Sequence, residues 1–94
     1  MRATGWKGGT YGVRVGQQNA AKFFRKNWSG IIVEIGGRPH YYALRSTFWT
    51  TCPEFRGAEI GDWLEANGLA PWRSGEPPDL ELTPLGENRF KLSV

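Results

Sequence analysis

Three closely spaced cations, Lys22, Arg25 and Lys26, have the types and spacing that best fit a defined chemistry. They fall in residues 17–26, which we expect to be helical, at positions i, i+3 and i+4, so they would share one face of the helix. Three positive charges on one face match the closely spaced phosphates of a nucleic-acid backbone. The alternative is a solvated surface helix, although no acid lies nearby to balance the charge. Arg14 joins this set if the outer face of its strand is open.

Nucleophilic or metal chemistry finds less support. His40 and Cys52 are the only residues of their types, so a Cys/His pair has to be considered. No residue can be assigned as the third group that would orient the histidine, and one His with one Cys falls short of the three or four ligands that zinc takes. We therefore expect no enzymatic activity, no cofactor and no metal site, and we keep a small Cys/His enzyme as a third alternative.

A group of acids, Glu59, Asp62 and Glu65, has positions i, i+3 and i+6 of a later predicted helix. Paired carboxylates can serve hydrolysis or Mg²⁺ binding. A solvated helical face explains the same spacing, and we prefer that interpretation.

Five tryptophans are many for a chain of 94 residues. Trp63 and Trp28 have the spacing of core residues, whereas Trp49 and Trp72 stand among loop residues and are candidates for a contact surface. Together with the Pro-rich residues 71–78 they suggest an alternative function from another class. The chain would then be a protein-interaction module whose exposed aromatics and Pro-rich loop bind a partner.

The charge of the chain is divided by position, which the net charge of +3 hides. Residues 1–47 hold eight Lys or Arg and one acid, Glu34, whereas residues 48–94 hold four Lys or Arg and eight acids. A basic half within one small domain predicts a surface for a polyanion, with nucleic acid as the first candidate.

Length and composition limit the remaining classes. The 94 residues suffice for one domain with one modest core, and 13 Gly with 6 Pro indicate many turns between short elements. The single cysteine forms no intrachain disulfide and the first residues lack the apolar run of a signal peptide, so we expect an intracellular protein, cytoplasmic or bound to nucleoid or nuclear DNA. No segment approaches the ~20 apolar residues of a membrane span, so no membrane association is expected.

Residues 1–10 are expected to be a flexible basic arm, in which Arg2, Trp6 and Lys7 stand among three glycines. Residues 11–94 would then form the single folded domain. Its first strand is predicted by the alternation of Tyr11, Val13 and Val15 with smaller or charged residues, and the helix over residues 17–26 follows.

The most distinct local pattern is a hairpin in which Gly36 and Gly37 turn a β-prone run, residues 31–35, into a second strand over residues 39–45. A short helical turn over residues 47–52 follows, and then a helix over residues 58–67, which we expect to pack through Trp63. Alternating apolar residues over 79–83 and 89–94 predict a closing hairpin. The fold class is therefore α+β and β-rich: a small open barrel of about five to seven strands with two helices.

The order of these elements resembles a known family. The matching segments are GVRVGQQNAAKFF (12–24), GIIVEI (30–35), YALRSTFW (42–49) and IGDWLEANGL (60–69). In the same order and near the same spacing they are similar to the plant B-three DNA-binding domain of auxin-response and related transcription factors. A similar pseudobarrel forms the recognition domain of some bacterial restriction endonucleases.

The resemblance implies an open seven-stranded pseudobarrel with two helices, which enters the major groove of DNA through two arms. Carried over, the N-terminal arm is residues 2–10. The C-terminal arm is the loop after Phe48 and Trp49, namely Thr50, Thr51, Cys52, Glu54 and Arg56. The chain departs from the family in two ways: it has no matching strand before the N-terminal arm, and residues 71–78 replace a short Gly-Asp turn.

The expected function is therefore non-enzymatic binding of double-stranded DNA through a basic face and two loops or arms. Arg56 can pair bidentately with guanine, and Thr50 and Thr51 can contact base edges, unless Arg56 only steadies its loop by pairing with Glu54 or Glu59. The recognition sequence, the choice between DNA and RNA, the oligomeric state and the pathway do not follow from the sequence. The candidate binding residues are Arg2, Lys7, Arg14, Lys22, Arg25, Lys26, Trp49, Thr50, Thr51 and Arg56.

Overall fold

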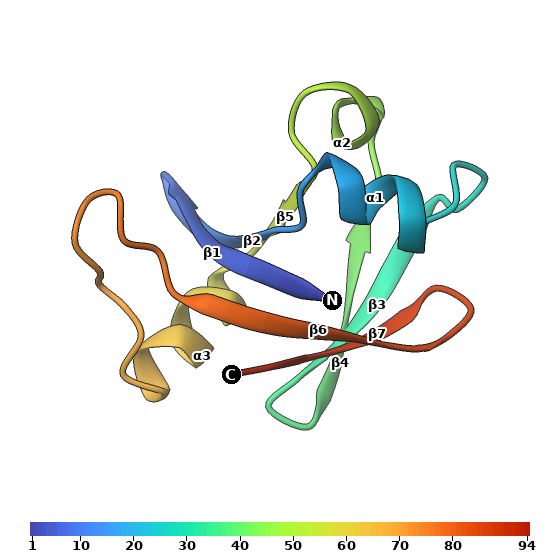
Figure 1. Cartoon of the computed structure of the whole chain (residues 1–94). Helices are drawn as coiled ribbons and strands as arrows, with labels where there is room; N and C mark the ends of the chain where they lie inside the picture. Colours follow the sequence, from blue (N-terminus) through green and yellow to red (C-terminus); the bar gives the residue numbers. More distant parts are fainter.

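The protein folds as one seven-stranded sheet with three short helices in a computed structural model that describes all 94 residues (Figure 1). The strand order in the sheet is β4-β3-β7-β6-β1-β2-β5. In chain order the elements are β1 (Arg2–Gly8), β2 (Thr10–Arg14), α1 (Gln17–Phe23), β3 (Gly30–Ile35), β4 (Arg38–Ala43), α2 (Ser46–Thr50), β5 (Glu54–Arg56), α3 (Ala58–Ala66), β6 (Asp79–Gly86) and β7 (Arg89–Ser93).

The sheet curls into a nearly closed pseudobarrel, which confirms the predicted fold class. Seventeen buried apolar residues fill its interior, and no charged or polar residue belongs to this core. At one end, α1 and α2 cover the strands, and Phe24 stacks on Phe90 with ring centroids 4.7 Å apart. At the other end lies α3, whose Ile60 and Leu64 are fully buried (Figure 1).

Both predicted hairpins are confirmed. Gly36 and Gly37, with φ of 60° and 82°, turn β3 into β4, because a tight two-residue hairpin turn needs positive φ at both positions. The alternating apolar residues of β6 and β7, including Leu82 and Phe90, face the core.

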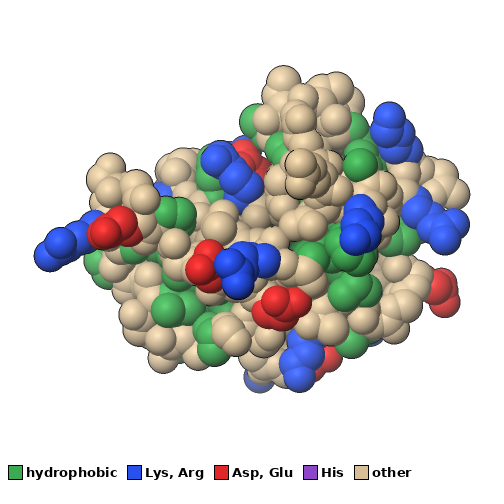
Figure 2. Space-filling model, in the orientation of Figure 1, with side chains coloured by type: hydrophobic (Ala, Val, Ile, Leu, Met, Phe, Trp, Pro, Cys, Tyr) green, Lys and Arg blue, Asp and Glu red, His purple; other side chains and the backbone are tan.

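The closing hairpin also explains why the division of charge along the sequence does not produce one basic half of the molecule. β6 and β7 lie between β1 and β3, and β7 pairs with β3 in parallel. The acid-rich C-terminal segment is thus placed between strands of the basic N-terminal segment. Figure 2 shows the result on one face, where Lys and Arg side chains are spread over several elements with acids among them.

The expected flexible arm at residues 1–10 is wrong. Residues 2–8 form β1, which pairs with β2 from Thr4 to Gly8 and with β6 through Arg2, Ala3 and Thr4. Ala3 and Gly5 face the interior and are buried. The glycines of this segment suggested mobility because they give it no apolar pattern. In the fold Gly5 has a packing role instead, since Pro78 and Trp72 leave little room for a side chain at its position.

Two helix predictions also need correction. α1 ends at Phe23 rather than at residue 26, because Phe24 takes an extended conformation and turns its ring into the core. The helix over residues 58–67 is confirmed as α3, but Ile60 and Leu64 are its buried anchors, whereas Trp63 is only half-buried. The burial of Phe24, Ile60 and Leu64 agrees with the helical spacing; the end of the first helix and the dominant role given to Trp63 were wrong.

The barrel does not close between β4 and β5, which are the two edges of the sheet. Beneath this gap Tyr42 and Phe55 touch, with ring centroids 4.8 Å apart, and both are buried. The Tyr42 hydroxyl donates a hydrogen bond of 2.5 Å to Glu59 Oε2 in α3. Side chains therefore seal the core where backbone pairing stops.

Candidate nucleic-acid interface

The outer face of β1, β2 and β5 carries Arg56, a cation of the predicted set that lies against an aromatic ring. The strand register aligns Trp6, Gly12 and Arg56 in one row across the three strands. The guanidinium carbon of Arg56 lies 4.8 Å from the centroid of the Trp6 ring, a cation–π stack. Arg56 belongs to neither ion pair of the chain, so the alternative that it pairs with Glu54 or Glu59 is wrong.

The middle residue of this row has to be a glycine. A Cβ on Gly12 would come within 2.5 Å of the Phe55 carbonyl oxygen and 3.0 Å of Arg56 Cβ. Without that atom, β5 lies close against β2, and the side chains of Trp6 and Arg56 meet across the bare backbone between them. The stack leaves the N–H groups at the guanidinium edge free to donate, since a cation–π contact uses only the face of the ion.

Arg14 lies one row further along the same face and is engaged. Its Nε and Nη2 both approach Glu54 Oε2 at 3.3 Å, from the adjacent position of β5. The Glu54 side chain is only 4% exposed, whereas Arg14 is 54% exposed. Arg14 is thus an outward-facing cation whose charge is partly neutralised within the protein.

The predicted stripe of Lys22, Arg25 and Lys26 does not form as one face, because the helix ends before Arg25. All three side chains are exposed, but they line two separate hollows of the surface. Lys22 and Arg25 border a hollow beside the β6–β7 turn, together with Glu87. Lys26 borders a different one, on the side of α2.

The groove between α1 and α2 has a volume of about 450 Å³ and brings together residues that were predicted separately. Lys26, Trp49 and Thr50 all line it, above the buried rings of Phe24 and Phe48. Trp49 is half-buried and packs edge-on against Phe48, with centroids 5.0 Å apart. It is therefore less available to a partner than an aromatic in an open loop would be.

The segment that the resemblance implies as the C-terminal arm lies mostly in regular structure, namely the end of α2 and β5. Trp49 and Thr50 belong to the single turn of α2, and the Thr50 hydroxyl donates to the Ser46 carbonyl at 3.3 Å. The backbone N–H of Thr51 bonds to the Thr47 carbonyl at 3.0 Å, and its side chain is exposed. Of the two threonines, only Thr51 has a hydroxyl with no bond inside the protein.

Arg2 and Lys7 sit at opposite ends of β1, and their odd spacing points their side chains to opposite sides of the strand. Lys7 Nζ lies 5.2 Å from the centroid of the Tyr11 ring. Arg2 shares the outer side with Trp6. The structure therefore brings Arg2, but not Lys7, to the face that holds Arg14 and Arg56.

Two amides of α1 connect this face to the α1–α2 groove. Asn19 Nδ2 donates to the Arg2 carbonyl at 2.8 Å, and Gln17 Nε2 donates to the Thr50 carbonyl at 3.1 Å. α1 is thereby docked between β1 and α2. Cations of the outer face and Lys26 of the groove consequently belong to adjoining surfaces.

Tyr42 and Glu59, beneath the open edge, have shifted proton affinities. Burial, with a further contribution from its bond to Glu59, raises the pKa of the Tyr42 phenol well above its ordinary value. The same hydrogen bond lowers the pKa of Glu59. Near neutral pH the pair is therefore a neutral phenol that donates to an ionised carboxylate, a structural tie between β4 and α3.

Sequence reasoning did not select Trp6 or Arg45 as site residues. Trp6 was assigned to a mobile arm, so its place next to Arg56 had no local signal; only the pairing of β1 with β2 and β5 creates it. Arg45 precedes α2 and lines the gap between β4 and β5. Cys52 is exposed in the same gap, and no three His, Cys, Asp or Glu side chains gather in an arrangement that would hold a metal ion.

No protein-family model, curated protein or solved structure shows a significant match to this chain. None of its three helices has the length and apolar character required to cross a bilayer.

Proposed function

We propose that this protein binds double-stranded DNA without catalysing a reaction, through the outer face of β1, β2 and β5 and the adjoining end with α1 and α2. The stack of Arg56 on Trp6 carries the proposal. An exposed guanidinium that is held by an aromatic ring, without a carboxylate partner, keeps its charge and its planar donor edge for a ligand. That geometry suits phosphate oxygens or the O6 and N7 atoms of guanine.

The surrounding charges support a polyanionic ligand. Arg2 and Arg14 share the face with Arg56, and Lys26 stands on the adjoining groove. Lys22 and Arg25 flank the same end of the molecule. The cations lie on several sides of α1 rather than in one line, which suits the two phosphate strands of a duplex better than a single extended acidic segment. The resemblance to the plant B-three domain points to the same ligand.

The alternative through exposed aromatics receives less support. Trp72 packs edge-on against Tyr11 with centroids 5.3 Å apart, and Trp49 packs on Phe48. Both indoles are half-buried against their own chain. They therefore offer a partner less apolar surface than the sequence suggested.

Fluorescence anisotropy with a labelled random duplex of about 20 base pairs tests the proposal. Measured between about 50 and about 200 mM salt, log K should fall linearly with log salt, with a slope of about −0.9 per phosphate contact. A slope of about −3 or steeper is expected from the cations named above. No binding at the lower salt concentration, or an affinity that does not change with salt concentration, would overturn the assignment.

A further inference from the structure

The gap between β4 and β5 exposes backbone groups on both of its sides. On β4, the register with β3 and the bond from the Leu44 N–H to the Ser29 carbonyl show which residues direct their backbone N–H and C=O groups toward β3. Residues 38, 40 and 42 exchange hydrogen bonds with β3 in this pattern. Tyr41 and Ala43 therefore direct their N–H and C=O groups away from β3, into the gap.

β5 is arranged in the same way. The Gly57 N–H bonds to the Tyr11 carbonyl and the Val15 N–H to the Pro53 carbonyl, so the backbone N–H and C=O groups of Phe55 point toward β2. Glu54 and Arg56 must then direct their backbone groups toward β4. The Glu54 N–H bonds to the Cys52 carbonyl, which leaves the two carbonyls and the Arg56 N–H on this edge.

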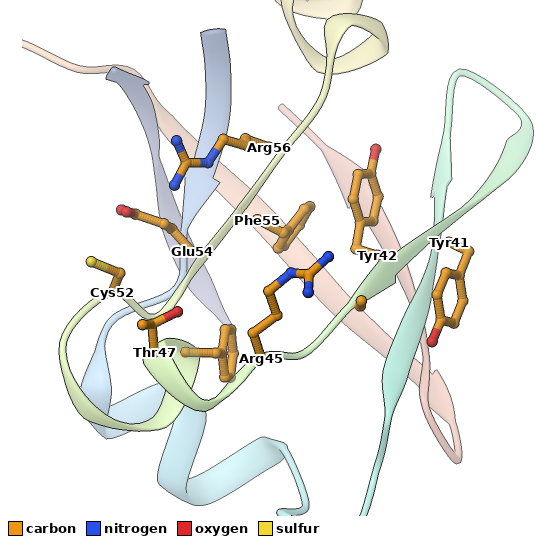
Figure 3. A pocket seen from close by; sticks show the side chains of 10 residues that line it. Tyr41, Tyr42, Arg45, Thr47, Cys52, Glu54, Phe55 and Arg56 are labelled. Atoms are coloured by element: carbon orange, nitrogen blue, oxygen red, sulfur yellow. The ribbon is translucent and has the colours of Figure 1, made fainter. Parts of the chain in front are cut away.

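The gap is a shaped cleft rather than a flat seam. It has a volume of about 330 Å³ and is lined by both edges, with the buried rings of Tyr42 and Phe55 as its floor. In Figure 3 the guanidinium of Arg45 extends from the α2 end of the cleft toward these rings. The Arg56 side chain points the other way, toward β1 and β2, in agreement with its stack on Trp6.

The charge of the cleft is positive. Arg45 belongs to neither ion pair of the chain, and the nearest acid on the lining, Glu54, is already held by Arg14. In Figure 3 the Glu54 carboxylate lies on the far side of β5 from Arg45. A ligand in the cleft would thus meet open strand edges, an apolar floor and one available guanidinium.

We infer that the β4–β5 cleft is a strand-addition site for an extended acidic peptide segment. The peptide pairs its backbone with the open edge of β4 or β5, sets alternate apolar side chains on Tyr42 and Phe55, and places an Asp or Glu against Arg45. Strand addition obtains affinity from the main chain and selectivity from alternate side chains, which are the two features that this cleft supplies. The site is separate from the outer face proposed for DNA.

The probe for a test is a peptide with blocked ends, Val-Glu-Val-Glu-Val-Glu-Val, titrated into ¹⁵N-labelled protein. Saturable shifts are expected at the amides of Tyr41, Ala43 and Arg56. A version with alternate backbone nitrogens methylated should lose binding, since it cannot pair with a strand edge. A version with Gln in place of Glu should bind about 3- to 10-fold more weakly, as for the loss of one charge-assisted hydrogen bond.

Two protein variants locate the site. Arg45→Gln should weaken the Glu peptide by the same 3- to 10-fold, whereas Arg73→Gln, which removes an exposed arginine in the loop before β6, should not. Ala43→Pro removes one N–H that faces the cleft. β4 already holds Pro39 in the same series of positions, where a proline removes no hydrogen bond to β3.

The outcomes separate the possibilities. Equal binding of the methylated peptide, shifts located away from β4 and β5, or no shift at millimolar peptide would each overturn strand addition. If duplex DNA instead displaces the peptide and Arg45→Gln weakens both ligands equally, the cleft is part of the DNA surface and not a peptide site. Should Ala43→Pro unfold, the methylated peptide on the unmodified protein gives the same answer.

Discussion

The cations on the strands and the cations after α1 are held in different ways. Arg14 and Arg56 are held on β2 and β5 by a carboxylate and an indole ring. Arg25 and Lys26, after a short helix, have no ion-pair or aromatic partner, and Lys22 lies only over the ring of its neighbour Phe23, 5.4 Å from the centroid. A cation held in one orientation can distinguish one base from another, because base recognition depends on geometry. A mobile cation can attract phosphate with equal strength on any sequence. The two regions are therefore expected to divide specificity and affinity between them.

The largest effect is expected from the region after α1. Replacing Lys22, Arg25 and Lys26 together by Ala should make the negative slope of log K against log salt less steep by about 2 to 3. At about 50 mM salt the affinity for every duplex should fall about a hundredfold or more. Anisotropy titrations at several salt concentrations measure both quantities. An unchanged slope would mean that these cations do not touch phosphate. The single variant Lys26→Ala then shows whether the α2 side or the β6–β7 side carries the contact.

The second effect tests whether the strand region reads bases. Arg56→Ala should remove about 1 to 3 kcal/mol of discrimination at one base pair and leave affinity for random DNA nearly unchanged. Selection from a random duplex library before and after the substitution measures this. If the unmodified protein enriches no motif, or if the variant loses affinity on all sequences alike, the two regions do not differ and the protein is a non-specific DNA binder.

Much of this fold could be predicted from the sequence, because its local signals agree with its tertiary packing. The Gly36-Gly37 turn, the alternation in β6 and β7 and the helix α3 each required only neighbouring residues. The errors occurred where distant segments decide the outcome. β1 has few large apolar residues and becomes a strand because β2 and β6 pair with it on both sides, a long-range effect that alternation cannot register.

The candidate site was predictable in its residue types but not in its arrangement. The sequence suggested Arg14 as a phosphate contact and Arg56 as either a base-reading residue or a partner of Glu54 or Glu59. Only the register of β2 with β5 shows that Arg14 meets Glu54 and Arg56 meets Trp6. The cleft between β4 and β5 had no sequence signal at all. It exists because the sheet stops short of closure, which depends on the pairing of all seven strands.

A smaller effect is expected from the ring that holds Arg56. Trp6→Ala should leave the guanidinium in place but free to move, and the discrimination assigned to Arg56 should fall by about 0.5 to 1 kcal/mol, the usual magnitude of an exposed cation–π contact. The same library selection measures it, and Trp6→Phe, which keeps an aromatic face, should restore part of the loss. Equal motifs in the wild type and Trp6→Ala would show that the stack is structural only.

The smallest effect concerns Arg14, whose charge Glu54 partly neutralises. Glu54→Gln keeps the size of the side chain but removes the ion pair, so the charge of Arg14 is no longer partly neutralised within the protein. Affinity should rise about 2- to 4-fold at low salt, in line with about 0.2 to 1 kcal/mol for an ion pair whose cation lies at the surface. Removing any acid raises affinity through net charge alone, so Glu65→Gln on the exposed face of α3 is the matched control. The gain in affinity of Glu54→Gln over this control is measured once with Arg14 present and once in the Arg14→Ala variant. The difference between the two gains is the effect of the Arg14–Glu54 pair. If the gain persists without Arg14, Glu54 acts on DNA directly, and its pairing with Arg14 does not limit binding.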